Sequence, residues 1–227
     1  MYKTILIDLD NTLLDSKQSQ EQALKASLDH FNLPAKDDFL NLFVNINQVL
    51  WGQLEEGKIS QEDLRLARFK DFFDVIGMGY DPEEAKEFYE SQLAKQVVFV
   101  PGAENLLKAL KDKYRVYIAS NGISHIQRSR LSLSGLDQYL DGYFISEEMG
   151  YSKPNPAYFD YIFSHLQAAD LESSIMLGDS LTSDIRGSQA VGLDCVWFNP
   201  DHKEKPEEIE IKGEISQLEE FLIYLES

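Results

Sequence analysis

The sequence is poor in cysteine and contains no long apolar run. Cys195 is the single cysteine among 227 residues, which excludes an internal disulfide and indicates a reducing compartment. No segment approaches the roughly 18 consecutive apolar residues that a membrane-spanning helix needs, and no lipid-anchor signal is visible. The first ten residues, MYKTILIDLD, place acidic side chains where a signal peptide would be apolar. We therefore expect a cytoplasmic protein without a membrane partner.

Basic charge is also scarce. The chain has 39 acidic residues against 21 basic ones and a formal net charge of -18. Such a charge repels polyanions at long range, which argues against nucleic-acid polymers and anionic membranes as partners. A small anionic substrate stays compatible with it, because a metal ion and one or two cationic side chains can reverse the potential inside a single cleft.

The residue types that bind zinc are few and dispersed. His30, His125, His165 and His202 are scattered along the chain, and together with one cysteine they do not make the spacing of a zinc site. We assign these histidines no role in chemistry.

The length allows one domain with a smaller insertion. Residues 3–9, KTILIDL, form a short apolar run that predicts a buried strand. Residues 17–95 contain helix-like stretches and no convincing strand, which predicts a helical insertion of about four helices. Ser60 with Asp63 three residues later has the pattern of a capping box at the start of one of them.

Beyond Pro101-Gly102 the pattern changes to alternating helices and strands. We expect strands at YRVYIAS, GYFIS, SSIMLGD and DCVWFN, with helices between them, including NPAYFDYIFSHLQ and one at 183–191. Helical crossovers of this length predict a parallel sheet covered on both faces. The expected fold is α/β, a Rossmann-like doubly wound sheet with an inserted helical unit. The tail predicts a short strand at EEIEIKG and a closing helix over residues 215–227.

Polar residues follow several of the predicted strands. Ligands of such a sheet bind beyond the carboxyl ends of its strands, so residues at these ends are expected to share one crevice. They are Asp8, Asp10 and Thr12 after the first strand, Ser120 and Asn121 after YRVYIA, Lys153 in a loop, and Asp179 and Asp184 after SSIML.

Several carboxylates brought together raise one another's pKa unless a cation neutralises them. The expected ligand atoms are all oxygen, the kind that Mg²⁺ prefers. The sequence therefore predicts a magnesium site at this edge of the sheet.

At these residues the chain resembles the haloacid dehalogenase superfamily of phosphatases. The matching motifs are Asp8-Leu9-Asp10-Asn11-Thr12, the strand end at Ser120, Lys153-Pro154, and GDSLTSD at 178–184, in the order of that family. The resemblance implies a core of residues 1–16 and 96–227, with residues 17–95 as a small helical cap over the active site.

The resemblance also implies roles for these residues. Asp8 would be the nucleophile that forms an aspartyl-phosphate, and Asp10 would protonate the leaving oxygen and then deprotonate the hydrolytic water. Lys153 would neutralise the nucleophile and the transferring phosphoryl group. Mg²⁺ would be held by Asp8, the Asp10 backbone carbonyl and Asp179, with Asp184 supporting it directly or through water. Ser120 and the backbone N–H of Asn121 would bind phosphoryl oxygens, and Thr12 would orient its neighbours.

Asp10 also bears on the reaction. Dehalogenases of the superfamily lack this acid–base aspartate, so its presence favours phosphoryl transfer over halide displacement. A phosphomutase, which also transfers a phosphoryl group, is a further alternative. The segment INQVLWGQLEEGKIS, with GDSLTSDI and AVGLDCVWFNP, resembles noncanonical pyrimidine 5'-nucleotidases. That branch implies a pyrimidine nucleoside monophosphate as substrate, with Trp51 as a candidate to border the base and Asn47 one helical turn earlier.

Two alternatives are left open by the sequence. One is a phosphatase of another small metabolite, such as phosphoglycolate. The other is a catalytically silent protein that binds phosphate as a sensor, for which loss of Asp8 or Asp10 would be the expected signature. The chain is expected to be a monomer or a homodimer.

Overall fold

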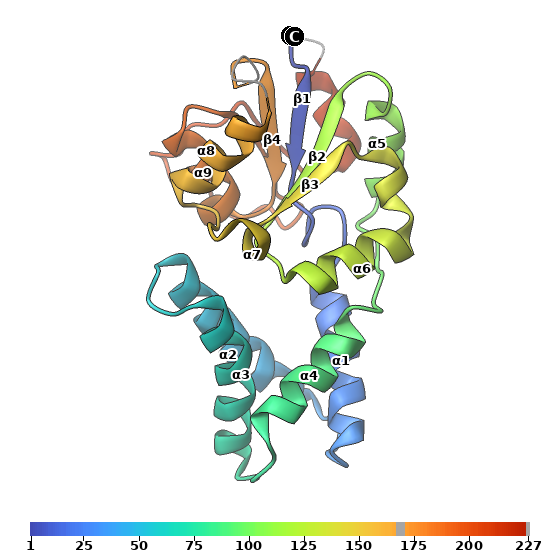
Figure 1. Ribbon diagram of the computed structural model, residues 1–227, viewed down its shortest axis with the longest axis vertical. Helices are drawn as coiled ribbons and strands as arrows, with labels where there is room; N and C mark the ends of the chain where they lie inside the picture. Colours follow the sequence, from blue (N-terminus) through green and yellow to red (C-terminus); the bar gives the residue numbers. More distant parts are fainter. Residues whose placement is uncertain (167–170, 226–227) are drawn as a thin grey trace. The chain divides into compact units, whose positions relative to one another are not determined.

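The computed structural model describes residues 1–166 and 171–225, and it divides the chain into two compact units (Figure 1). The first combines Met1–Ser16 with Val97–Ser227 and contains the sheet. The second is Lys17–Gln96 and is helical. None of the helices in the described ranges has both the length and the apolar character required to cross a bilayer.

The first unit is built on a six-stranded parallel sheet in the order β3-β2-β1-β4-β5-β6. The strand β1 lies between β2 and β4, with Ile7 opposite Ile118 and Leu177. The order reverses at β1, and this places the topological switch point at its carboxyl end. The doubly wound α/β fold is therefore confirmed. The strands are β1 (Thr4–Ile7), β2 (Arg115–Ser120), β3 (Gly142–Ile145), β4 (Ser174–Gly178), β5 (Asp194–Phe198) and β6 (Gly213–Ile215).

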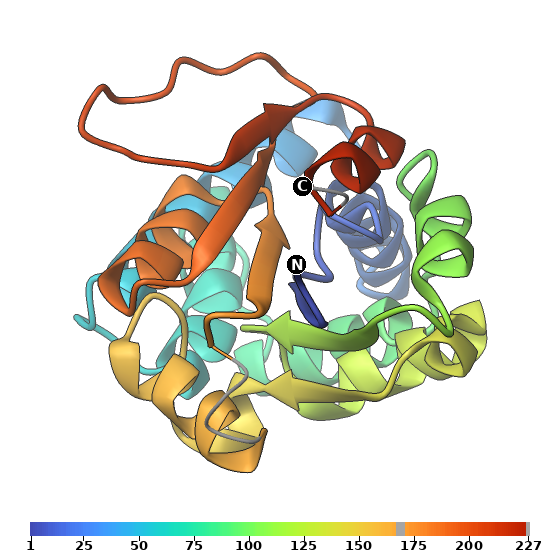
Figure 2. The same cartoon turned by 90° about the horizontal axis from the view of Figure 1, so that it is seen from above.

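Helices cover both faces of the sheet, as Figure 2 shows. Alternate residues of β1 serve the two faces: Ile5 and Ile7 belong to one hydrophobic cluster with α5, and Leu6 belongs to another with α8. Burial of both faces explains why the strands read as continuous apolar runs. The helices of this unit are α5 (Ala103–Leu110), α6 (Ser124–Ser134), α7 (Ser146–Met149), α8 (Pro156–His165) and α9 (Gly187–Ala190), with 3₁₀ segments at Leu136–Tyr139 and Leu218–Tyr224.

The second unit consists of helices α1 (Ser16–His30), α2 (Asp37–Glu55), α3 (Gln61–Ile76) and α4 (Pro82–Leu93). Its core is rich in aromatic rings, with Phe43, Phe69, Phe72 and Tyr89 packed against one another. The predicted capping box is confirmed: the hydroxyl of Ser60 accepts from the Asp63 N–H at 3.1 Å, and the Asp63 carboxylate accepts from the Ser60 N–H at 3.0 Å.

Two elements near the end of the chain differ from the prediction. The segment EEIEIKG is not a strand, because the pairing with β5 begins at Gly213. Ile209 nevertheless packs into a hydrophobic cluster. The alternation of apolar residues in this segment therefore reflects burial of side chains and does not indicate strand pairing. The helix expected at 183–191 begins earlier, as a π-helical turn over Leu181–Arg186 that continues into α9.

The two other predicted helices end close to undescribed residues. NPAYFDYIFSHLQ forms α8, which ends at His165, and Gln167 lies outside the described residues. The closing segment is a 3₁₀ helix over Leu218–Tyr224, and residues 226–227 lie outside the described residues.

The aromatic core of the helical unit generates a prediction about stability. Phe72 on α3 is 1 % exposed, so Phe72→Ala should lower the free energy of unfolding by about 3 kcal/mol or more through lost burial and a residual cavity. The matched control on the same helix is Val75→Ala, because Val75 is 65 % exposed. Denaturant titration followed by circular dichroism measures both. Equal losses in the two variants would contradict the assignment of this core.

Candidate active site

Asp8 directly follows β1 and lies at the switch point of the sheet. Its backbone N–H donates to the Leu177 carbonyl at 2.9 Å, which extends the pairing with β4 by one residue. The side chain is buried, and its Oδ1 accepts a hydrogen bond from the Lys153 ammonium at 2.7 Å. A carboxylate is therefore held against a fixed cation at the place where this fold binds ligands.

Lys153 reaches the same point from the loop between α7 and α8. Its Nζ also donates to Asp184 Oδ1 at 2.6 Å and to the Ala119 carbonyl at 2.5 Å. Burial alone lowers the pKa of Lys153, but the Asp184 and Asp8 carboxylates outweigh it and leave the pKa above its usual value. Lys153 therefore stays protonated although it is 1 % exposed.

The Lys153 loop is held in place by the amide of Asn121. The Asn121 side chain donates to the Lys153 carbonyl at 2.7 Å and accepts from the Lys153 N–H at 2.8 Å. This pair of hydrogen bonds joins the end of β2 to the loop. The sequence predicted a phosphate contact from the Asn121 backbone; it did not reveal this positioning role of the side chain.

Asp179 and Asp184 complete a cluster of three carboxylates with Asp8. One ligand oxygen of each lies within 4.8 Å of the others. Asp179 follows β4, and its carbonyl accepts from the Trp197 indole at 2.9 Å. Asp184 comes from the π-helical turn and can approach the strand end because residue 178 is glycine, where an added Cβ would overlap the Asp184 carboxylate.

Electrostatics make this cluster a good place for a divalent cation. Burial, together with the neighbouring carboxylates and against the opposing effect of Lys153, raises the pKa of Asp8 well above its usual range. Burial and the Asp184 carboxylate raise the pKa of Asp179 to about 7. Three carboxylates face one ammonium, so two negative charges are left to balance. Three oxygen ligands with this charge suit Mg²⁺ in donor type and charge.

The Asp10 side chain faces other partners. Its Oδ1 accepts from the Arg130 guanidinium at 2.6 Å, and its Oδ2 accepts from the Gln127 amide at 2.5 Å. Gln127 and Arg130 both come from α6, three residues apart and hence on one face of the helix. The sequence prediction missed both. A polar pair at this spacing directly after the Ser120-Asn121-Gly122 turn is the signal that could have found them.

Ser120 belongs to the same set of contacts. Its hydroxyl accepts from the Gln127 amide at 2.9 Å and from the Gly122 N–H at 3.0 Å. Gly122 is needed there, because a Cβ on it would overlap the Gln127 amide. Ser120, the predicted phosphate-binding serine, is therefore hydrogen-bonded to Gln127, which in turn donates to Asp10.

Two predicted site residues have other surroundings. The hydroxyl of Thr12 is buried with no hydrogen-bond partner among the described residues, so its predicted orienting role has no contact to support it. Trp51 lies half-buried on α2 in the helical unit. Asn47, on the same helix, is buried and donates to Gln20 at 3.0 Å. The roles of these three residues stay predictions.

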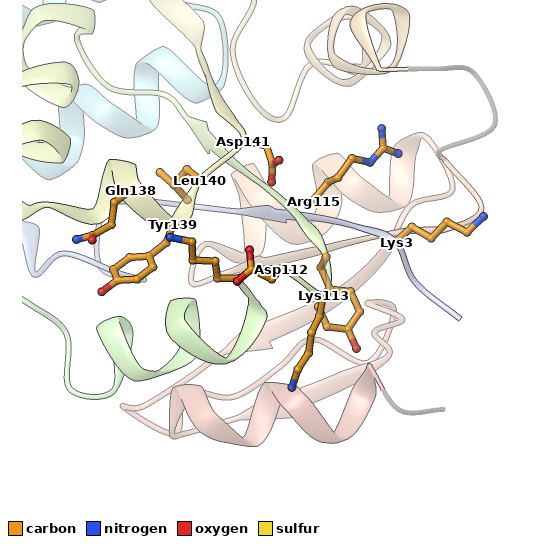
Figure 3. A pocket seen from close by; sticks show the side chains of 10 residues that line it. Lys3, Asp112, Lys113, Arg115, Gln138, Tyr139, Leu140 and Asp141 are labelled. Atoms are coloured by element: carbon orange, nitrogen blue, oxygen red, sulfur yellow. The ribbon is translucent and has the colours of Figure 1, made fainter.

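A separate pocket of about 420 Å³ opens at the opposite end of the strands. Figure 3 shows that charged side chains of both signs line it. Lys3 precedes β1 and Arg115 begins β2, so this pocket lies at the amino ends of the strands. None of the predicted site residues lines it.

The comparisons with known proteins agree with this geometry. A family model of haloacid dehalogenase-like hydrolases matches residues 2–192. The chain belongs to this family. The hydrolase is 35 % identical to the pyrimidine 5'-nucleotidase PynA of Streptococcus pneumoniae, covering 97 % of this chain and 94 % of that one. It is 32 % identical to the pyrimidine 5'-nucleotidase YjjG of Escherichia coli, covering 95 % and 94 %.

A solved structure gives the same fold over the whole chain. The hydrolase is similar to the magnesium-bound HAD-hydrolase YfnB of Bacillus subtilis, with a TM-score of 0.94 and 35 % identity over 100 % of this chain and 99 % of that one. The resemblance inferred from the motifs is therefore confirmed at the level of the family and of the fold.

The raised pKa of Asp179 generates a prediction about metal and pH. Its ordinary value is 3.8, so the metal-free folded state binds this proton more tightly than the unfolded chain, and the group destabilises the fold as pH rises from about 4 to 7. Mg²⁺ should therefore raise the unfolding temperature more at about pH 8 than at about pH 5.5.

Differential scanning fluorimetry with EDTA or Mg²⁺ at the two pH values measures this effect. Asp179→Asn imitates the protonated form and should reduce both the pH dependence and the response to Mg²⁺. A Mg²⁺ response of the same size at both pH values in the natural protein would contradict the prediction.

Proposed function

We propose that this hydrolase is a Mg²⁺-dependent phosphomonoester phosphatase that acts through an aspartyl-phosphate on Asp8, with pyrimidine nucleoside monophosphates as substrates. The single observation that carries the proposal is the buried Asp8 carboxylate, held by Lys153 at 2.7 Å within a cluster of three carboxylates at the switch point. A catalytically silent sensor would not require this arrangement together with Asp10.

In the first step, an oxygen of Asp8 attacks phosphorus and the bond from phosphorus to the ester oxygen breaks. Asp10 gives its proton to the departing oxygen, so the leaving group departs as a neutral alcohol. Lys153 keeps its charge throughout, because the carboxylates around it hold its pKa high. A fixed cation next to the transferring group stabilises the charge on the phosphoryl oxygens without any reorganisation.

In the second step, water attacks the phosphorus of the aspartyl-phosphate. Asp10, now ionised, takes a proton from that water, the phosphorus–Asp8 bond breaks, and inorganic phosphate leaves. Asp8 returns to a carboxylate and Asp10 to an acid, so both are ready for another cycle. The Ser120 hydroxyl, at the end of β2, is proposed to bind a phosphoryl oxygen during both steps.

The metal ion would be held by Asp8, Asp179 and Asp184, with the Asp10 carbonyl as a further ligand proposed from the family resemblance. When bound, Mg²⁺ supplies positive charge that offsets the charge of the phosphoryl oxygens. The pKa values of Asp8 and Asp179, raised by burial and by the neighbouring carboxylates, support this assignment, because a bound cation would stabilise the ionised forms that burial disfavours.

The choice of substrate rests on the relatives. PynA and YjjG are named pyrimidine 5'-nucleotidases and match this chain over nearly its full length. We assign Lys17–Gln96 the role of a cap that selects the leaving group, with Trp51 bordering the base. An anionic phosphorylated metabolite is compatible with the strongly acidic chain, because a bound cation and Lys153 would make the potential positive at the site itself.

The nucleophile generates the first functional prediction. Asp8→Asn should reduce phosphate release by at least about 10³-fold, because an amide oxygen is a poor nucleophile, while the protein stays folded by circular dichroism. The matched control is Asp137→Asn, an exposed position in the same unit, which should keep full turnover. Near-normal turnover of Asp8→Asn would overturn the mechanism.

The identity of the leaving group generates the second functional prediction. In a phosphate-release screen with Mg²⁺, pyrimidine nucleoside monophosphates should exceed sugar phosphates and phosphoglycolate in kcat/KM. Trp51→Ala should lower kcat/KM for nucleotides by about 10-fold, through lost contact with the base, and Trp51→Phe should keep most of it. A preference for phosphoglycolate or a sugar phosphate would favour the alternative of a small-metabolite phosphatase.

A further inference from the structure

The contacts of Asp10 include two side chains that neither the motifs nor the mechanism above use. Arg130 and Gln127 are 2 % and 1 % exposed, so both lie inside the sheet unit. Each donates to a different oxygen of the Asp10 carboxylate, Arg130 to Oδ1 and Gln127 to Oδ2. A carboxylate held at both oxygens by two donors has a fixed plane and cannot turn about its terminal bond without breaking one of them.

The two donors are themselves held. Arg130 donates to the side-chain amide oxygen Oε1 of Gln127 at 3.1 Å, so the side chains of Asp10, Gln127 and Arg130 form a closed triangle of hydrogen bonds. The Gln127 amide also donates to the Ser120 hydroxyl at 2.9 Å. Gly122 leaves the space that this amide occupies. The triangle is therefore anchored to the end of β2 and to α6.

The carboxylate in the triangle still has room to act. A carboxyl group offers about four sites on its two oxygens, and these two donors use one on each oxygen, so a remaining site can carry the proton that Asp10 transfers. The Asp10 side chain is 32 % exposed, whereas that of Arg130 is 2 % exposed. The rigid partners thus lie on the buried side of Asp10, and the exposed side can meet a substrate oxygen.

We propose that Arg130 and Gln127 are positioning residues that fix the Asp10 carboxylate in the orientation needed for proton transfer to the leaving oxygen, with Gln127 linking it to Ser120. The proposal rests on the proposed phosphatase function. It adds that the geometry of acid catalysis is set by α6, outside the motifs that carry the nucleophile and the metal ligands. Small errors in orientation are costly in such a transfer.

The experiment compares substrates that differ in how much they need a proton. The phenol of an activated aryl phosphate has a low pKa and can leave as a phenolate without a proton, whereas the nucleoside of a nucleoside monophosphate would be a strongly basic alkoxide and depends on the proton from Asp10. Gln127→Met and Arg130→Met should lower kcat/KM for a nucleoside monophosphate by about 10²-fold and for dinitrophenyl phosphate by less than about 3-fold. Arg130→Lys should recover part of the loss, because it keeps the charge without the guanidinium geometry.

The matched control is Arg128→Met, since Arg128 lies on the same helix but is exposed and pairs with Glu148 at 2.7 Å. It should show no dependence on the leaving group. In an Asp10→Ala background, Gln127→Met should cause no further loss, because the group that it positions is gone.

Each outcome decides the proposal. Equal losses for both kinds of substrate, or an undiminished effect in the Asp10→Ala background, would show a structural role and overturn it. If Arg130→Met does not fold, Gln127→Met and Arg130→Lys give the same test. Failure here with an inactive Asp8→Asn leaves the proposed function intact, whereas turnover by Asp8→Asn would remove the proposed function itself.

Discussion

The site is organised around one buried ammonium. Lys153 contacts the carboxylates of Asp8 and Asp184 at 2.7 and 2.6 Å, far from water. A buried charge is costly unless it is paired and hydrogen-bonded, and this requirement ties the Lys153 loop to β1 and to the turn after β4. Without the lysine, the buried carboxylates of Asp8 and Asp184 would repel one another with little solvent to screen them. With it, they can lie together and still carry excess negative charge.

The excess negative charge makes the cluster suitable for binding a divalent cation. Lys153 balances one of three carboxylates, and burial together with the Asp184 carboxylate raises the pKa of Asp179, so that this group favours a bound proton. A divalent cation can replace the proton and balance the charge. The same reasoning makes the proposed phosphate ester compatible with a net charge of -18, because the potential at the site depends on nearby cations and not on the distant surface.

Asp10 lies two residues from Asp8 but belongs to a different electrostatic environment. Asp8 faces Lys153 and the carboxylates of Asp179 and Asp184, while the Asp10 carboxylate faces Arg130 and Gln127. Asp8 and Asp10, to which the proposed reaction gives different roles, therefore differ in their partners although they lie two residues apart in the chain. The turn after β1 makes this possible, because it sends the two side chains to different neighbours.

The sequence by itself determined the parallel α/β fold, the helical insertion and the residues at the strand ends. These follow from local patterns: apolar runs buried on both faces, helix caps such as Ser60 with Asp63, and polar residues placed where strands stop. The strand predicted at EEIEIKG from the alternation of apolar and polar residues was wrong, because apolar side chains can be buried without strand pairing. Only the tertiary structure decided which side chains touch. Asn121 and Lys153 are 32 residues apart in the sequence, and Arg130 and Asp10 are 120 apart. Contacts between residues so far apart form only when the whole sheet assembles, and they leave no periodic pattern in the sequence.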